Sequence, residues 1–204
     1  MLTTTHVLVA GGVLARPSQR WFQAAAAWTG GLFPDLSVFV MVAVSRAGSA
    51  GANLWRRPDG VYWSEPWQTF SAISNSFPLY AALMGLGFAL TKAGERAKAW
   101  GVAAMLFAGG ALLHLGLDFP VHTDDAHVHF WPFSDWRFHS AISYYQRDHY
   151  GAAVGTIEMI GGLALAALVF VRFKAWPIRV LAVALALPYF VRFGFLFRWD
   201  PLGG

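Results

Sequence analysis

Residues Ala99–Phe119 read AWGVAAMLFAGGALLHLGLDF, an apolar run whose one charged side chain, Asp118, stands near its end. A helix needs about 20 apolar residues to cross the hydrocarbon core of a bilayer. Three further runs reach that length: Trp21–Val44, Gly151–Val171 and Ile178–Phe197. Charged residues make up 13% of the 204-residue chain, roughly half the fraction that is usual in soluble domains. The sequence therefore predicts a membrane protein.

Two other apolar segments are shorter or mixed in composition. Leu2–Ala15 is strongly apolar but short. The run that ends at Leu90 is clearly apolar from Phe77 and reaches spanning length if its helix begins near Thr69. We therefore predict an all-α fold, a polytopic bundle of about six transmembrane helices, in which residues 1–204 form a single integral membrane domain.

The distribution of Lys and Arg predicts the orientation. Eight of the 15 basic residues lie in three short connections, Arg16–Arg20, Thr91–Lys98 and Arg172–Arg179. The two long connections, Ser45–Gln68 and Pro120–Tyr150, hold five over a much greater length. Because short basic loops stay in the cytoplasm, we expect a multi-pass protein of the bacterial inner (plasma) membrane with both long loops and both termini in the periplasm.

Composition also narrows the function classes. The basic residues form no continuous patch, which argues against nucleic-acid binding, and the bilayer is the expected partner. The absence of Cys excludes disulfides and thiolate chemistry. Tryptophans in the long loops are interpreted as interfacial anchors: Trp55, Trp63, Trp67, Trp131 and Trp136.

Ionisable residues gather at the predicted outer ends of the helices. Burying such residues in a membrane span costs free energy, so those that occur there usually serve a function. His6 lies in the first apolar run, Asp35 follows Pro34 in the second, and His114 and Asp118 share one helix face at i and i+4. Imidazole and carboxylate suit a divalent metal such as zinc or manganese. A His/Asp pair one turn apart is more often a hydrogen-bonded structural pair than half of a metal site, but the cluster as a whole indicates a metal site more strongly, because its members come from distant parts of the sequence.

The second long loop carries a dense run, HTDDAHVH, over residues 122–129. This run is interpreted equally well as a metal site and as a solvated loop. Glu158 lies inside the predicted helix that begins at Gly151. Instead of binding a metal, it could neutralise Arg192 at the same membrane depth. The additional site candidates are His122, Asp124, His127, His129, His149 and Glu158.

Three short motifs resemble the YdjM-like family, described as LexA-regulated, membrane-bound, metal-dependent hydrolases. They are Thr5-His6, GLFPDL at 31–36 and HLGLD at 114–118. The block His129–Trp136 looks like a divergent proteobacterial subgroup. The resemblance implies that His6, Asp35, His114 and Asp118 occupy metal-site positions. On that basis we predict His6, His114 and Asp118 as ligands, and Asp35 as a further ligand or the general base.

Two departures from the family pattern leave the function open. Ser37 stands where the family often has Asp, and Asn75 stands where it commonly has His. One hypothesis is a membrane-embedded metal-dependent hydrolase with its site at the periplasmic, outer-leaflet face, acting on a lipid-like ester or phosphoester. The alternative is a non-catalytic accessory or scaffold subunit that binds other membrane proteins.

Overall fold

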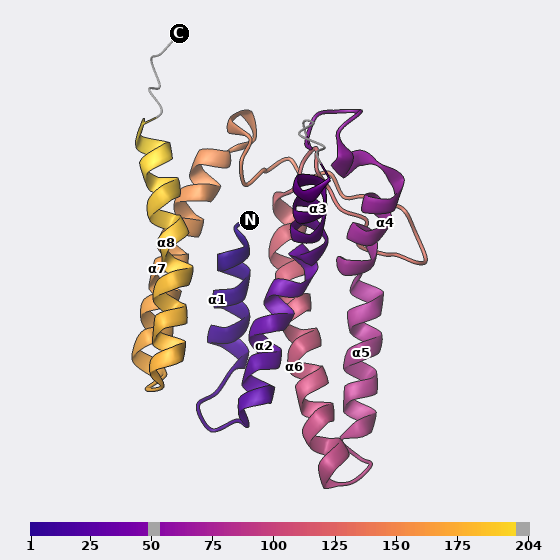
Figure 1. Cartoon of the computed structure of the whole chain (residues 1–204), viewed down its shortest axis with the longest axis vertical. Coiled ribbons are helices and arrows are strands. Elements are labelled where there is room, and N and C mark those ends of the chain that lie inside the picture. The colour runs from indigo at the N-terminus through magenta and orange to yellow at the C-terminus, as the bar shows by residue number, and fades with distance from the viewer. Residues whose placement is uncertain (49–53, 199–204) are drawn as a thin grey trace.

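The computed structural model describes residues 1–48 and 54–198, with side chains through Val191. Its regular secondary structure over these residues is helical, without a named strand. Figure 1 shows the helices running roughly side by side. They are α1 (Thr3–Leu14), α2 (Trp21–Leu32), α3 (Leu36–Ala47), α4 (Glu65–Ser74), α5 (Phe77–Leu90), α6 (Glu95–Asp118), α7 (Gly151–Arg172) and α8 (Trp176–Arg198). The predicted all-α class is confirmed over this part of the chain.

Among the described residues, four segments are long and apolar enough to cross a membrane, as expected of a multi-pass protein: Trp21–Ala47, Glu65–Leu90, Glu95–Val121 and Gly151–Arg172. Helix α1 has 12 residues, which gives it a length of about 18 Å, so it is too short to cross alone. The part of α8 whose side chains are described, Trp176–Val191, is also a shorter apolar helix. The six-helix count thus stays a prediction.

Two of these four segments are interrupted, and the two interruptions lie next to each other. A turn of 3-10 helix, Phe33–Asp35, separates α2 from α3 and contains Pro34. The proline interrupts the α-helix because it cannot donate the backbone hydrogen bond that would continue it. Asn75 ends α4, and the Ser76 hydroxyl caps α5 by accepting from the Leu79 amide. The side chains of Ser74 and Asn75 both donate to the Pro34 carbonyl, at 3.0 and 3.3 Å.

Helix α6 is the centre of the packing, with α1, α2 and α5 against it. Glycines let the backbones approach closely, as is common between membrane helices. A Cβ added at Gly30 would collide with the Phe107 carbonyl oxygen, and one at Gly31 would lie 2.7 Å from that of His6. This close approach brings the N-terminal end of α1 and the C-terminal ends of α2 and α6 together.

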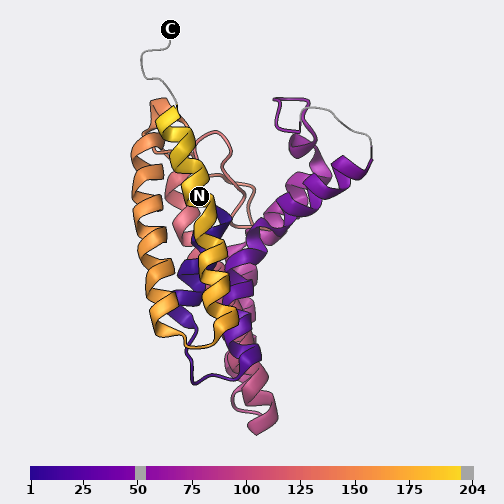
Figure 2. The same cartoon turned by 60° about the vertical axis from the view of Figure 1, so that its left-hand side comes forward.

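The α7–α8 pair joins the rest of the bundle mainly through α1. The Thr5 hydroxyl of α1 lies 2.8 Å from Glu158 Oε1 of α7 and 2.7 Å from the Tyr189 hydroxyl of α8, and all three residues are buried. Figure 2 shows α3 and α4 leaning away from this pair above the α1–α2–α6 contact. In the view of Figure 1, the N-terminus lies at the upper end of α1, between the α7–α8 pair and the α2–α3 segment.

The connections divide between the two ends of the bundle. The short α1–α2, α5–α6 and α7–α8 connections lie at the lower end in Figure 1, and the segment between α6 and α7 lies at the upper end. We therefore expect reporter fusions at Gly94 and Ala175 to be active in the cytoplasm and one at Thr123 to be active in the periplasm, because basic short loops are retained inside. The reverse pattern would place the candidate site at the cytoplasmic face.

The glycine packing gives a stability prediction. Gly30→Ala is expected to lower the apparent melting temperature in detergent, with a cost of about 1–3 kcal/mol, because the new Cβ meets the Phe107 backbone. Gly116→Ala on α6 is the matched control, since a Cβ there meets nothing within 4 Å. Equal melting temperatures for the two variants would contradict the close contact of α2 and α6.

Candidate functional site

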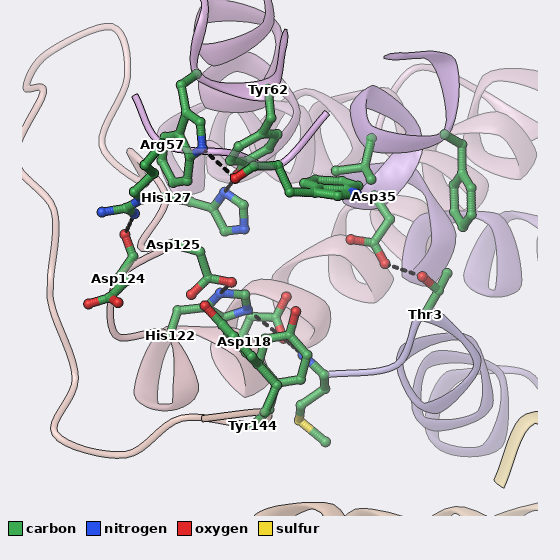
Figure 3. Close-up of a pocket in the computed structure, with 16 residues that line it drawn as sticks. Thr3, Asp35, Arg57, Tyr62, Asp118, His122, Asp124, Asp125, His127 and Tyr144 are labelled. Atoms are coloured by element: carbon green, nitrogen blue, oxygen red, sulfur yellow. Dashed lines mark hydrogen bonds and ion pairs between the residues drawn. The ribbon is translucent and has the colours of Figure 1, made fainter. Parts of the chain in front are cut away.

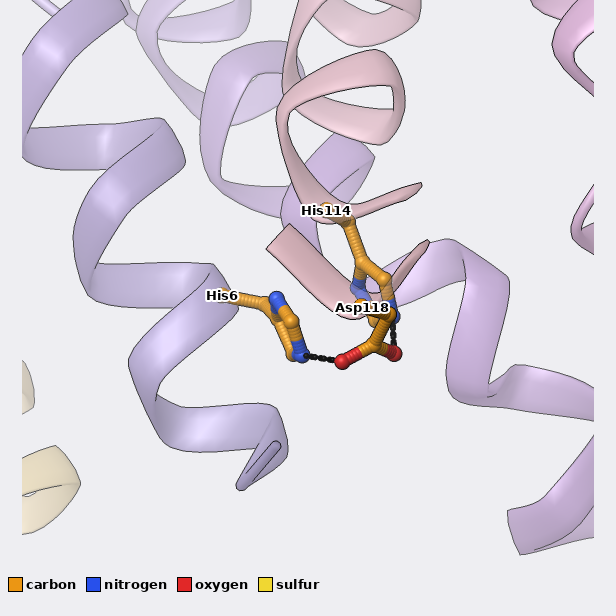
Figure 4. A group of neighbouring side chains, drawn as sticks. All are labelled: His6, His114 and Asp118. Atoms are coloured by element: carbon orange, nitrogen blue, oxygen red, sulfur yellow. Dashed lines mark ion pairs between the residues drawn. The ribbon is translucent and has the colours of Figure 1, made fainter. Parts of the chain in front are cut away.

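Three predicted ligands meet at the N-terminal end of α1 and the C-terminal end of α6 (Figure 4). His6 Nε2 lies 3.0 Å from Asp118 Oδ1, and His114 Nε2 lies 3.2 Å from Asp118 Oδ2. The two imidazole rings stack with their centroids 3.6 Å apart. One ligand atom from each of the three residues lies within 4.8 Å of the others, and all three residues are buried.

The hydrogen bonding of His114 makes this cluster informative. Its Nδ1 lies 2.8 Å from the Gly31 carbonyl oxygen, which can only accept, so Nδ1 carries the hydrogen. In a neutral imidazole Nε2 then has a bare lone pair. That lone pair faces two carboxylates, Asp118 at 3.2 Å and Asp35 at 3.6 Å. Two acceptors facing each other in a buried site require a cation or a second proton between them.

Asp35 reaches this position because the chain breaks at Pro34. Its Oδ2 accepts a hydrogen bond from the Thr3 hydroxyl at 2.5 Å, and its side chain is 23% exposed. The N-terminal amine of Met1 lies 2.8 Å from Asp118 Oδ1. The Asp35 carboxylate thus borders the buried cluster on one side and open space on the other.

A cavity of about 570 Å³ joins this cluster to the second long loop (Figure 3). Asp35 and Asp118 line it together with His122, Asp125 and His127. His122 Nε2 lies 3.5 Å from Asp118 Oδ1, and His122 Nδ1 lies 3.0 Å from Asp125 Oδ2. The helix-end residues and part of the HTDDAHVH run therefore share one site.

Burial and charge shape the titration of the loop residues. Burial disfavours the charged form of His122, but the neighbouring Asp118 and Asp125 carboxylates outweigh it and raise the His122 pKa to about 9. Burial and the nearby imidazoles of His122 and His129 hold the His127 pKa well below its usual value. At neutral pH, His127 is thus a neutral imidazole that is able to bind a cation.

The other additional candidates lie outside this cluster. His129 Nδ1 donates to the Asn75 carbonyl at 3.1 Å, and burial lowers its pKa to about 4. His149 lies at the end of the loop, where its Nδ1 meets the Ala141 carbonyl. Asp124 is at the cavity rim, with its carboxylate accepting from Gln146 at 2.7 Å.

Glu158 serves the packing of α1 and lies outside the residues that line the cavity. It accepts from the Leu2 amide at 2.5 Å as well as from the Thr5 hydroxyl. The Arg192 side chain, its partner in the sequence-based alternative, lies outside the described residues. The predicted pairing therefore stays a prediction.

The two departures from the family pattern are also accounted for by contacts. Ser37 and Asn75 are each 3% exposed. The Ser74 hydroxyl donates to Ser37 Oγ at 3.1 Å, and Asn75 Nδ2 donates to the Pro34 and Ser71 carbonyls. Ser37 thus links α3 to α4, Asn75 links the end of α4 to the Phe33–Asp35 turn, and neither side chain lines the cavity.

Several cavity residues were not predicted as site residues. Trp55 and Trp63, interpreted from sequence as interfacial anchors, line the cavity with Tyr62 and Tyr144. Arg57 stacks on Trp63, with its guanidinium carbon 3.8 Å from the ring centroid, and donates to the Asp124 carbonyl. Burial raises the Tyr62 pKa to about 12, so its hydroxyl stays protonated. The clustering of Trp and Tyr from Trp55 to Trp63 is the sequence feature that could have identified these cavity residues.

Comparison of the chain with protein-family models, curated proteins and solved structures gave no significant match. The site is therefore interpreted from its own geometry.

The cluster gives a binding prediction. His114→Ala is expected to weaken the tightest-bound zinc or manganese ion by at least about 100-fold, because even loss of an outer-shell partner costs 10- to 100-fold. Equilibrium dialysis of purified protein against the metal measures this. His149→Ala removes an imidazole outside the cavity and should bind as the wild type does. Equal affinity for all three proteins would remove His114 from the site.

Proposed function

We propose that this chain is a membrane-embedded, metal-dependent hydrolase whose site lies at the periplasmic, outer-leaflet face. The observation that carries the proposal is the buried Nε2 of His114, which lies beside two carboxylates, with the His6 ring stacked on the His114 ring. Zinc and manganese are the ions whose ligand preferences fit these imidazole and carboxylate groups. The resemblance of the three short motifs to the YdjM-like hydrolases supports the same proposal.

The donor set fits a divalent ion on chemical grounds. Among the described residues, the Nε2 atoms of His6 and His114 have no hydrogen-bond partner, although each lies near Asp118. The Asp118 carboxylate is close enough to each ring for an ion pair. A neutral imidazole can offer such a nitrogen to a metal ion, so the two Nε2 atoms and the Asp118 carboxylate can serve as ligands of one cation. A bound divalent ion would polarise a substrate oxygen and acidify a water molecule.

Asp35 is the residue that we assign as general base. It lies at the cavity, stays partly exposed, and is oriented by the Thr3 hydroxyl. A carboxylate in this position can take a proton from a water molecule in the cavity, and such a step contributes about 100- to 10,000-fold to a rate. His6, His114 and Asp118 hold the ion in this proposal.

The cavity wall favours a lipid-like substrate. Val38 and Phe39 of α3 line the cavity, and Phe39 is 49% exposed on a segment long and apolar enough to span a membrane. An acyl chain can contact this wall while an ester or phosphoester lies near Asp35. The polar residues of the cavity select neither bond type.

The second candidate is an accessory or scaffold subunit, and one observation favours it. Ser37 and Asn75, where the resemblance would place ligands, are engaged in hydrogen bonds that link α4 to α3 and to the Phe33–Asp35 turn. In that case the chain would have the same fold but would not hydrolyse a substrate.

Hydrolysis assays on purified protein test the two proposals. Wild-type protein, charged with zinc or manganese, is expected to cleave a fluorogenic lipid ester or phosphodiester in mixed micelles. Asp35→Asn should slow turnover at least about 100-fold while the metal is retained. Asp148→Asn is the matched control, because that side chain is 81% exposed and outside the cavity. Wild-type protein without metal and without cleavage would favour the scaffold.

A further inference from the structure

A second group of ligand side chains lies beside the first, on the loop between α6 and α7. It consists of His122, Asp125 and His127, all of which line the cavity. Figure 3 shows these side chains on one side of Asp118, while Asp35 lies on the other. The three short motifs that resemble a known family contain none of these three residues.

His122 presents the same chemical difficulty as His114. It is 5% exposed, and a carboxylate oxygen lies near each ring nitrogen, Asp118 at 3.5 Å from Nε2 and Asp125 at 3.0 Å from Nδ1. In the described structure neither nitrogen meets the geometry of a hydrogen bond. Two ring protons, which the raised pKa of His122 implies at neutral pH, or one ring proton and a cation satisfy these two contacts. A bound cation would take the place of the second proton.

His127 and Asp125 complete a set of ligands. His127 Nδ1 lies 3.2 Å from the Ser71 hydroxyl and 3.5 Å from the Tyr62 hydroxyl, which leaves Nε2 for the cavity. Such fixing of one ring nitrogen is characteristic of metal-binding histidines. The His122 and His127 ring centroids are 4.9 Å apart. The buried Asp125 Oδ1 has no hydrogen-bond partner in the described chain.

We propose that His122, Asp125 and His127 bind a second divalent cation and that the Asp118 carboxylate bridges it to the ion held by His6 and His114. The inference rests on the proposed function, because it assumes the first ion. Asp118 suits the bridging role, since Oδ2 faces His114 and Oδ1 lies between His6 and His122. Paired ions in hydrolytic sites lie about 3.5–4 Å apart.

The two positions differ in how closely their ligands are gathered. Over the described residues, His6, His114 and Asp118 form the one group whose ligand atoms all lie within 4.8 Å of one another. The loop ligands are more widely spaced and must close around their ion. We therefore expect the helix-end ion to bind first and more tightly.

Metal counting on intact protein in detergent tests the second position. After loading with Mn²⁺ and removal of free ion, wild-type protein is expected to hold two equivalents by elemental analysis. His122→Ala should hold one. Asp125→Asn, a nearly isosteric change, should also hold one if His122→Ala fails to fold. The His149→Ala control, an imidazole at the end of the same loop, should keep two.

Electron paramagnetic resonance gives an independent readout of the bridge. Two Mn²⁺ ions that share a carboxylate should give an exchange-coupled signal in the wild type, and His122→Ala should give the signal of isolated Mn²⁺. One equivalent in the wild type that is unchanged in His122→Ala would overturn the second position and leave the proposed function standing. Loss of every ion from folded His122→Ala would also overturn it. No ion in the wild type would overturn both proposals.

Discussion

The burial of the Asp118 carboxylate is the constraint on which the site depends. The residue is 3% exposed at the end of α6, and an isolated carboxylate cannot be withdrawn from water without compensation. The compensating groups come from three parts of the chain: His6 and the Met1 amine beside α1, His114 on α6, and His122 on the loop. One charge therefore fixes the register of α1 against α6 and the position of the loop.

The helix-end group was predictable because its geometry is local or follows from the alternation of spans. His114 and Asp118 share a face at any helical i, i+4 spacing. His6 and Asp35 belong to the same membrane level if successive apolar runs cross in opposite directions. Asp35 needed one further clue, the proline before it, which interrupts the helix and turns the carboxylate toward the cavity.

The loop group was not predictable from spacing. His127 and His129 are two residues apart, so an extended strand would point both the same way. In the structure His127 reaches the cavity, whereas His129 turns to the Asn75 carbonyl beside Phe77 and Phe119. The orientation of His129 depends on its contact with Asn75 at the break between α4 and α5, which is distant from it in sequence. The tryptophans of the first loop were assigned to the interface for the same reason.

The glycine contacts among α1, α2 and α6 imply a pattern of mutational tolerance. Positions 30 and 31 have no room for a methyl group. A substitution there would therefore displace the helix ends that carry the histidine and carboxylate side chains of the site. A Cβ added at Gly85 or Gly161 would meet only open space, so these positions are free to vary without consequence for the site. Selection for function would therefore be recorded at small residues whose side chains take no part in the chemistry. A deep mutational scan would show intolerant glycines on the helix faces that meet and tolerant ones on the faces turned to lipid.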